Sequence, residues 1–233
     1  TVYTLVNWRD GSLLQFFNRM GFERGDMINL EHKINMGESG FCYPSPNKFS
    51  YNNRAVKEFK DSLSEFPLII RMMRAEDLER IIEIDHQLLG EKRPDFWKRK
   101  LDMIEKNSVL PPLVAETGNK VIGFILGQAS SWEYIVPENI GWIDTLGVDL
   151  AYQRKGVARS LMGELLNRMK KFGVNTVYTL VNWRDGSLLQ FFNRMGFERG
   201  GIINLELKID IEKSDFATIQ RSYNNRESLR KEK

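Results

Sequence analysis

The segment that decides the fold is LGVDLAYQRKGVA, residues 146–158, which joins an apolar strand-like run to an amphipathic helical stretch. Glycine and small residues at a strand-to-helix turn allow several backbone N–H groups to point toward one place. The N-terminus of the helix adds partial positive charge there, and Arg154 and Lys155 add full charges. The pattern predicts a phosphate-binding turn. The alternative for Gly156 is a plain helix start.

Two other phosphate-binding loops fit this segment poorly. A P-loop requires Gly-Lys followed by Ser or Thr, which the segment lacks. A dinucleotide-binding turn requires three spaced glycines, and of these only Gly156 is present.

Hydrophobic periodicity on both sides of the turn predicts the element order βααβββαβαβ, hence an α/β sheet with mixed strand directions. A tight turn at Gly118-Asn119 predicts a hairpin. Apolar stripes predict helices over 77–89, 94–104, 156–171 and 187–195. Short apolar runs predict strands over 68–72, 113–116, 121–126, 141–148, 177–181 and from 197 onward.

An internal repeat organises the rest of the chain. Residues 1–34, the first copy, recur as residues 176–209, the second copy, at an offset of 175. Only three positions differ between the copies: Asp26/Gly201, Met27/Ile202 and His32/Leu207. A period this long indicates duplication on the scale of a domain and excludes a solenoid repeat. The alternative is that the repeat is an artefact.

The simplest division of the chain follows from this repeat. Residues 1–36 are the duplicated end of a domain, and 37–67 are a linker rich in Gly, Pro, Asn and Ser. Residues 68–210 form a complete domain, and 211–233 are a polar tail.

Composition narrows the classes of function. A net charge of +3 is too small to indicate a nucleic-acid partner. One cysteine, Cys42, and two histidines argue against a disulfide framework or a structural metal site. Because the sequence has neither a membrane-spanning apolar run nor a signal-peptide pattern, we expect a cytoplasmic protein without a membrane partner. Thr1 in place of an initiator Met suggests that the true start lies elsewhere.

The motif Gln153-x-x-Gly156-x-Ala158, after a strand that ends Leu146-x-Val148, resembles the acyl-CoA signature of the GNAT N-acetyltransferase superfamily. The preceding hairpin, the following helix and the later Met195-Gly196-Phe197 agree with this resemblance, which covers about 68–209. It implies a GNAT-type fold, a mixed and mostly antiparallel sheet flanked by helices.

The resemblance also implies an activity, the transfer of an acetyl group from acetyl-CoA to a primary amine without a metal. In such domains the pantetheine arm pairs with the strand that carries the motif, and a backbone N–H there stabilises the thioester oxygen. The positions implied to bind acetyl-CoA are Leu146, Val148, Gln153, Arg154, Lys155, Gly156, Val157, Ala158, Arg159 and Asn182. For Asn182 the alternative is an ordinary turn residue.

A general base is needed because an ammonium ion with a pKa of roughly 10 has no lone pair to attack with. Asp144 is the first candidate, because it lies four residues before Val148 and shares its face if no bulge intervenes. Its alternative is a solvated strand carboxylate. Glu133, in the preceding loop, is the second candidate.

The general acid departs from the family pattern. Many members carry a tyrosine where this chain has Phe192, which has no hydroxyl. Tyr152 and Tyr178 are possible substitutes, although spacing places neither. The departure leaves three functions open: an acetyltransferase, a catalytically weak acyl-CoA-binding sensor, or a structural interaction domain. The last would leave Gln153–Ala158 unexplained.

The first copy lacks the phosphate turn and must bury its apolar face against something. We expect it to take the same sheet position as the second copy, within one chain or by segment exchange in a homodimer. The acceptor amine is set by segments around 89–96, 130–138 and 199–203, which carry no readable motif, although Trp132 and Tyr134 are candidate pocket residues.

Overall fold

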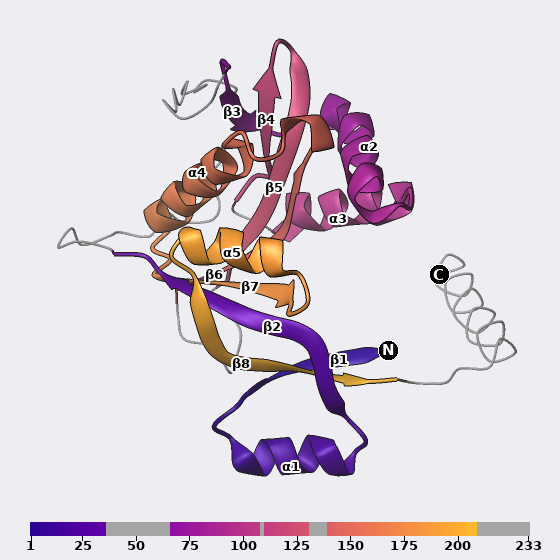
Figure 1. Ribbon diagram of the computed structural model, residues 1–233, viewed down its shortest axis with the longest axis vertical. Helices are drawn as coiled ribbons and strands as arrows, with labels where there is room; N and C mark the ends of the chain where they lie inside the picture. The colour runs from indigo at the N-terminus through magenta and orange to yellow at the C-terminus, as the bar shows by residue number, and fades with distance from the viewer. Residues whose placement is uncertain (36–65, 108–109, 131–138, 209–233) are drawn as a thin grey trace, which may run out of the picture. The chain divides into compact units, whose positions relative to one another are not determined.

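The computed structural model describes residues 1–35, 66–107, 110–130 and 139–208 (Figure 1). The chain forms two compact units. The large unit is Asn29–Gly200, and the small unit is Thr1–Ile28 together with the chain from Gly201 onward. Strands β2 (Glu23–Lys33) and β8 (Glu198–Leu207) each contain residues of both units. The expected tail, and all but the end of the expected linker, lie outside the described residues.

The large unit is built on a mixed sheet in the order β2-β7-β6-β5-β4-β3. Strands β3 to β6 pair antiparallel in sequence, whereas β6 and β7 are parallel. From β3 onward the element order is βααβββαβαβ, which confirms the prediction and the expected fold class. The strands are β3 (Ile69–Met72), β4 (Leu113–Thr117), β5 (Lys120–Ser130), β6 (Ile140–Val148) and β7 (Thr176–Asn182).

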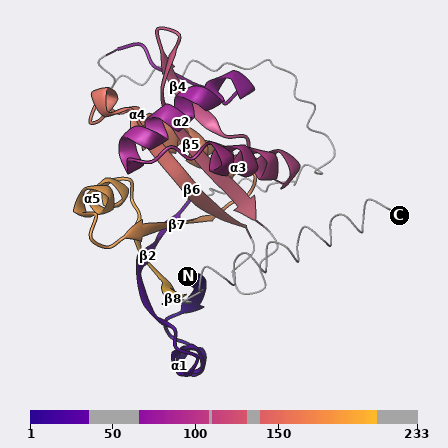
Figure 2. The ribbon, with the colours of Figure 1, turned by 90° about the vertical axis from the view of Figure 1, so that its right-hand side faces the viewer.

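Helices cover both faces of this sheet. The helices are α2 (Leu78–Leu89), α3 (Pro94–Asn107), α4 (Val157–Lys171) and α5 (Gly186–Arg194). Figure 2 shows α2 and α3 in front of β5 and β6, with α4 behind them. Most predicted bounds hold to within a residue or two, but α3 and β5 run several residues further because their regular backbone outlasts the apolar pattern.

The predicted hairpin turn is present between β4 and β5. Gly118 and Asn119 both have positive φ, 52° and 62°, and Thr117 pairs with Lys120 across them. Two consecutive left-handed residues are what a tight hairpin turn requires, and Gly and Asn adopt this conformation at low cost. The turn aligns β4 and β5 as the centre of the core.

One apolar core cluster lies between this hairpin and the two preceding helices. Trp97 is fully buried, and its ring packs edge-on against Phe124, with 5.1 Å between the ring centroids. Burying a large side chain of this kind contributes about 1.5–3 kcal/mol. The members of the cluster are Ile81, Ile84, Trp97, Val114, Val121, Phe124 and Leu126.

The small unit contains β1 (Val2–Asn7), α1 (Gly11–Arg19), the start of β2 and the end of β8. Strand β1 pairs antiparallel with β8, from Val2 opposite Leu207 to Asn7 opposite Ile202. Asp10 caps α1 by accepting a hydrogen bond from the Leu13 N–H (2.9 Å). No side chain of α1 is buried.

Candidate functional site

Strand β6, which leads into the predicted phosphate turn, is interrupted by a β-bulge. Leu126 of β5 lies opposite Thr145, but the next residue, Gly127, lies opposite Ile143. No residue of β5 therefore lies opposite Asp144. A Cβ added to Gly141 would meet Met169 of α4, whereas one added to Gly147 would meet Leu88 of α2. Since residues six apart share a face in a regular strand, the bulge reverses the alternation. The condition for Asp144 and Val148 to share a face is therefore not met.

Beyond the bulge, β6 and β7 are no longer paired. Their parallel register runs from Ile140 opposite Thr176 to Ile143 opposite Thr179 and extends no further among the described residues. Both strands continue, to Val148 and Asn182 respectively. The edge of β6 that carries Leu146 and Val148 thus leaves the β7 ladder where the resemblance expects a pantetheine arm.

The turn that follows β6 is anchored by a buried carboxylate, Asp149. This carboxylate accepts a hydrogen bond from the Ala151 N–H (2.9 Å) and contacts the guanidinium of Arg80 on α2. The backbone N–H of Asp149 donates to the Ile122 carbonyl of β5 (2.9 Å). Sequence reasoning did not single out Asp149 or Arg80. An acidic residue directly after a strand and before a turn was the available signal for Asp149.

The predicted phosphate turn spans residues 153–156 and leads directly into α4. Arg154 and Gly156 both adopt left-handed conformations, with φ of 61° and 86°. Gln153 Nε2 donates to the Val148 carbonyl (3.2 Å) and ties the turn back to the strand end. Alternating backbone conformations of this kind turn successive N–H groups toward one concavity.

The N-terminus of α4 completes the turn. Gly156 precedes the helix without a side chain, so it supplies no capping hydrogen bond to the first-turn N–H groups. Val157 is buried and fixes the helix, while Arg159 and Gln153 are exposed and Ala158 is half-buried. Lys155 lies 5.7 Å from the centroid of the Tyr152 ring. The structure thus brings the predicted residues 153–159 together around the start of one helix.

Of the two proposed bases, only Asp144 lies within the described residues. Its carboxylate accepts hydrogen bonds from Lys100 Nζ of α3 (2.9 Å) and Gln128 Nε2 of β5 (3.1 Å). Asp144 is thus an exposed residue whose carboxylate is held by two polar partners. Glu133, like Trp132 and Tyr134, lies outside the described residues.

The aromatic residues weighed as general acids differ in position. Phe192 is buried and packs edge-on against Phe197, with centroids 5.1 Å apart. Tyr178 is buried against Trp142 of β6, with centroids 5.3 Å apart. Tyr152 lies in the phosphate turn, where its ring is near Lys120 and Lys155.

Asn182 ends β7 and makes a local turn. Its side-chain oxygen accepts a hydrogen bond from the Arg184 N–H (2.9 Å). Asn7, the equivalent residue of the first copy, makes the same bond to the Arg9 N–H (2.9 Å) without a phosphate turn nearby in sequence. This bond is therefore common to both copies of the repeat, and it does not depend on what the Asn182 amide nitrogen contacts.

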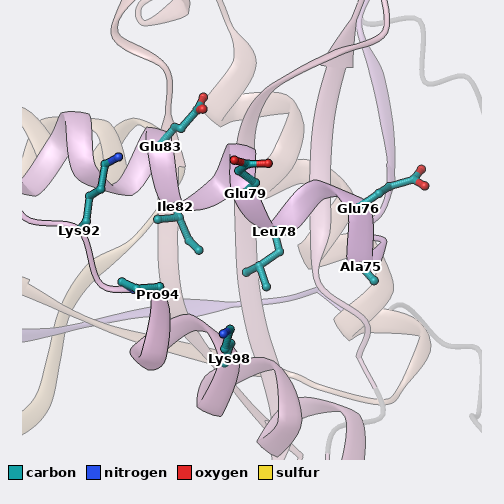
Figure 3. A pocket seen from close by; sticks show the side chains of 9 residues that line it. All are labelled: Ala75, Glu76, Leu78, Glu79, Ile82, Glu83, Lys92, Pro94 and Lys98. Atoms are coloured by element: carbon teal, nitrogen blue, oxygen red, sulfur yellow. The ribbon is translucent and has the colours of Figure 1, made fainter.

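A hollow on the outer side of α2 and α3 is separate from these residues. Its volume is about 670 Å³, and its lining includes Glu76, Glu79, Glu83, Lys92 and Lys98 (Figure 3). Glu76 and Glu83 already pair with Arg74 (3.1 Å) and Arg80 (2.7 Å). None of the predicted catalytic or CoA-binding residues lines it, but Lys92 and Pro94 belong to the 89–96 segment that was expected to set the acceptor amine.

Within the described ranges, no group of three or more His, Cys, Asp or Glu side chains could hold a metal ion. No helix in the same ranges combines the length and apolar character needed to span a bilayer.

Comparison with known sequences gives two relatives. The chain is 30% identical over 143 residues to the N-alpha-acetyltransferase RimI of Mycobacterium tuberculosis, a match that covers 58% of this chain and 82% of RimI. It is 28% identical over 141 residues to the uncharacterized protein ML0378 of Mycobacterium leprae, covering 58% of this chain. The match spans only 36% of that relative's length.

Comparison with solved structures supports the same fold. The GCN5-related N-acetyltransferase of Sphaerobacter thermophilus superposes with a TM-score of 0.55 at 19% identity, covering 90% of this chain and 61% of that one. The sequence profile of the Acetyltransferase (GNAT) family matches residues 75–197, which contain the bulged strand, the phosphate turn and α4. This agreement confirms the resemblance inferred from Gln153, Gly156 and Ala158. The chain belongs to the GNAT acetyltransferase family.

Proposed function

We propose that the protein transfers an acetyl group from acetyl-CoA to a primary amine by direct attack in a ternary complex. The observation that carries this proposal is the phosphate turn at 153–156 directly beside the strand edge that leaves β7 after Ile143. A nucleotide diphosphate and an extended, amide-bearing arm need these two surfaces next to each other.

The turn binds the diphosphate of acetyl-CoA through backbone and side chains. The N–H groups of Val157, Ala158 and Arg159 begin α4 and face an anion with the helix dipole behind them. Arg154, Lys155 and Arg159 supply charge-assisted hydrogen bonds. Asp149 and Arg80 keep the turn in place but do not touch the anion.

The edge of β6 positions the thioester. Backbone groups of Leu146 and Val148 pair with the amides of the pantetheine arm, and an N–H there stabilises negative charge on the thioester oxygen. Removing one such donor from an acyl-transfer site typically slows the reaction about 10²–10³-fold. The Asn182 amide nitrogen is available on the β7 side of the gap because its oxygen is used in the turn.

Asp144 removes the proton from the incoming ammonium, directly or through a water molecule. It lies on the face of β6 that is covered by α3, where Lys100 and Gln128 orient its carboxylate. Glu133 is the second candidate. No tyrosine hydroxyl occupies the place of Phe192, so water protonates the departing thiolate, whose pKa is not far above neutral.

The alternative function is an acyl-CoA-binding sensor with weak turnover. The burial of Phe192 among Phe191 and Phe197 favours it, because a buried aromatic cluster offers no proton donor. The two functions share the binding site and differ only in the rate of transfer.

Calorimetric titration of acetyl-CoA tests the binding site. The parent should bind, and Gly156→Asp should not, because it puts a carboxylate where the phosphate approaches. Gly156→Ala separates charge from backbone strain, since any side chain at φ 86° is strained. Gly186→Asp adds the same charge at the start of α5, where an added Cβ meets nothing within 4 Å, and should bind normally. A parent that does not bind acetyl-CoA contradicts both functions, whereas binding without turnover on an amine panel selects the sensor.

A further inference from the structure

The repeat places a strand of the first copy at the edge of the large-unit sheet. Strand β2 lies beside β7, and the Ile34 N–H donates to the Asn175 carbonyl (2.7 Å). His32 donates from Nδ1 to the Gly196 carbonyl (2.9 Å), and its ring stacks on Phe197 at 5.0 Å between centroids. In the large unit, the end of the second copy is thus covered by the first copy.

The small unit shows the reciprocal arrangement. There β8 of the second copy pairs with β1 of the first. A Cβ on Gly25 would collide with the side chain of Asn204, and in the large unit a Cβ on Gly200 would collide with Asn29. Since 25 and 29 become 200 and 204 at the offset of 175, the two contacts are equivalent. The first strand of each copy therefore lies beside the last strand of the other copy: β7 beside β2, and β1 beside β8.

This exchange decides which carboxylate lies beside β7. In the small unit Tyr3 lies opposite Glu206, and the equivalent residues of the other copies are Tyr178 and Glu31. The hydrogen bond between Ile34 and Asn175 fits the same register, which brings Glu31 opposite Tyr178. The two are close enough for the charge of Glu31, after burial, to raise the pKa of the Tyr178 hydroxyl. Glu206, the equivalent of Glu31, instead lies opposite Tyr3 in the small unit.

Resting on the function proposed above, we propose that Glu31 of the first copy is an acceptor-binding residue, which selects a positively charged amine. The Tyr178 ring lies tilted against Trp142, whose Nε1 is buried without a hydrogen-bond partner among the described residues. Trp142 shares a strand face with Asp144, two residues further along β6 and before the reversal. A carboxylate beside aromatic faces attracts an ammonium group, and Asp144 then receives its proton.

The placement of Glu31 is tested without any turnover. In a Cys42→Ser background, Glu31→Cys with Tyr178→Cys should form an intramolecular disulfide, because directly opposed residues hold their Cβ atoms about 4.5–5.5 Å apart. The matched control pairs Tyr178→Cys with Glu206→Cys, the same residue type at the equivalent position of the other copy. Peptide mapping after oxidation reads the link. A link in the control pair, or in neither pair, overturns the proposal.

The chemistry of Glu31 is tested by equilibrium binding of benzylamine, which is cationic at pH 7, and of neutral benzyl alcohol. Glu31→Gln should weaken benzylamine binding about tenfold, the loss of one charge-assisted hydrogen bond, and leave benzyl alcohol unchanged. Glu206→Gln should change neither. Equal binding of benzylamine to the parent and Glu31→Gln overturns the proposal. Because acetyl-CoA titration is read separately, loss of the donor site cannot be mistaken for loss of the acceptor site.

Discussion

The first and second copies of the repeat differ at only three of 34 positions, yet they are buried to different extents. Val177 and Tyr178 of β7 are 0% and 7% exposed, whereas their equivalents Val2 and Tyr3 are 42% and 60% exposed. The reason is the neighbour: β7 has β6 on its other side, and no strand is described on that side of β1. Burial here is a property of position in the sheet and not of local sequence.

The helices repeat this contrast. Phe192 of α5 is buried, while α1 buries no side chain at all. Phe197 is 2% exposed, but Phe22, its equivalent, lines an open hollow of about 440 Å³ in the small unit. The same amphipathic pattern thus produces a core helix in one unit and a surface helix in the other.

Replacing the buried phenylalanine of α5 should destabilise the protein far more than replacing its equivalent in α1. Phe192→Ala should lower the free energy of unfolding by about 3–5 kcal/mol, because it removes a buried ring and leaves a cavity. Phe17→Ala, the equivalent change in α1, should cost about 1 kcal/mol or less. Urea unfolding followed by circular dichroism measures both. Equal losses would mean that α1 is buried in solution.

A second effect is expected on the stability of the protein at alkaline pH. Burial raises the pKa of Tyr178, and the charge of Glu31 raises it further. Because the folded pKa lies above the unfolded value of roughly 10, this contribution is complete below that pH and is lost as pH rises through the folded pKa. Tyr178→Phe should therefore flatten the alkaline decline in melting temperature.

Charge variants test whether Glu31 is the carboxylate that raises the pKa of Tyr178. Glu31→Gln should lower the Tyr178 pKa toward its usual range, whereas Glu206→Gln should leave it unchanged. The opposite result would place β8, and not β2, beside β7.

The smallest expected effect is at the helix caps. Asp185 and Asp10 accept hydrogen bonds from the N–H groups of Leu188 and Leu13, each at 2.9 Å. Asp185→Ala should cost about 1 kcal/mol of unfolding free energy, and Asp10→Ala less, because α1 contributes little packing to lose. Calorimetric melting temperatures compare the two. Equal costs would show that the cap acts independently of packing.

The pH dependence of stability provides a control for the prediction at Asp185. The Leu188 N–H, followed by the Ser187 hydroxyl, holds the pKa of Asp185 below its usual range. The cap's electrostatic contribution is therefore present above the ordinary carboxyl pKa and is lost as pH falls through the lowered value. Asp185→Asn keeps a capping oxygen without a charge and should remove this acid dependence.

Much of the candidate site follows from short-range sequence signals. The turn at 153–156 could be predicted because Gly156, the flanking cations and the helix period are contiguous in sequence. The buried anchor formed by Asp149 and Arg80 could not, because its partners are 69 residues apart. The bulge at Asp144 could not be predicted either, since it is a mismatch between two paired strands and a single strand carries no record of it.

Local sequence was enough to predict the order of helices and strands, the Gly118-Asn119 turn and the glycine turn before α4, and to show two nearly identical copies. These depend on local periodicity and on residues that favour particular backbone angles. Only the tertiary structure decided which copy is buried, which face Asp144 occupies and which strand lies beside β7. Pairing between distant strands is set by the whole sheet, and two nearly identical segments offer it nearly identical local energies.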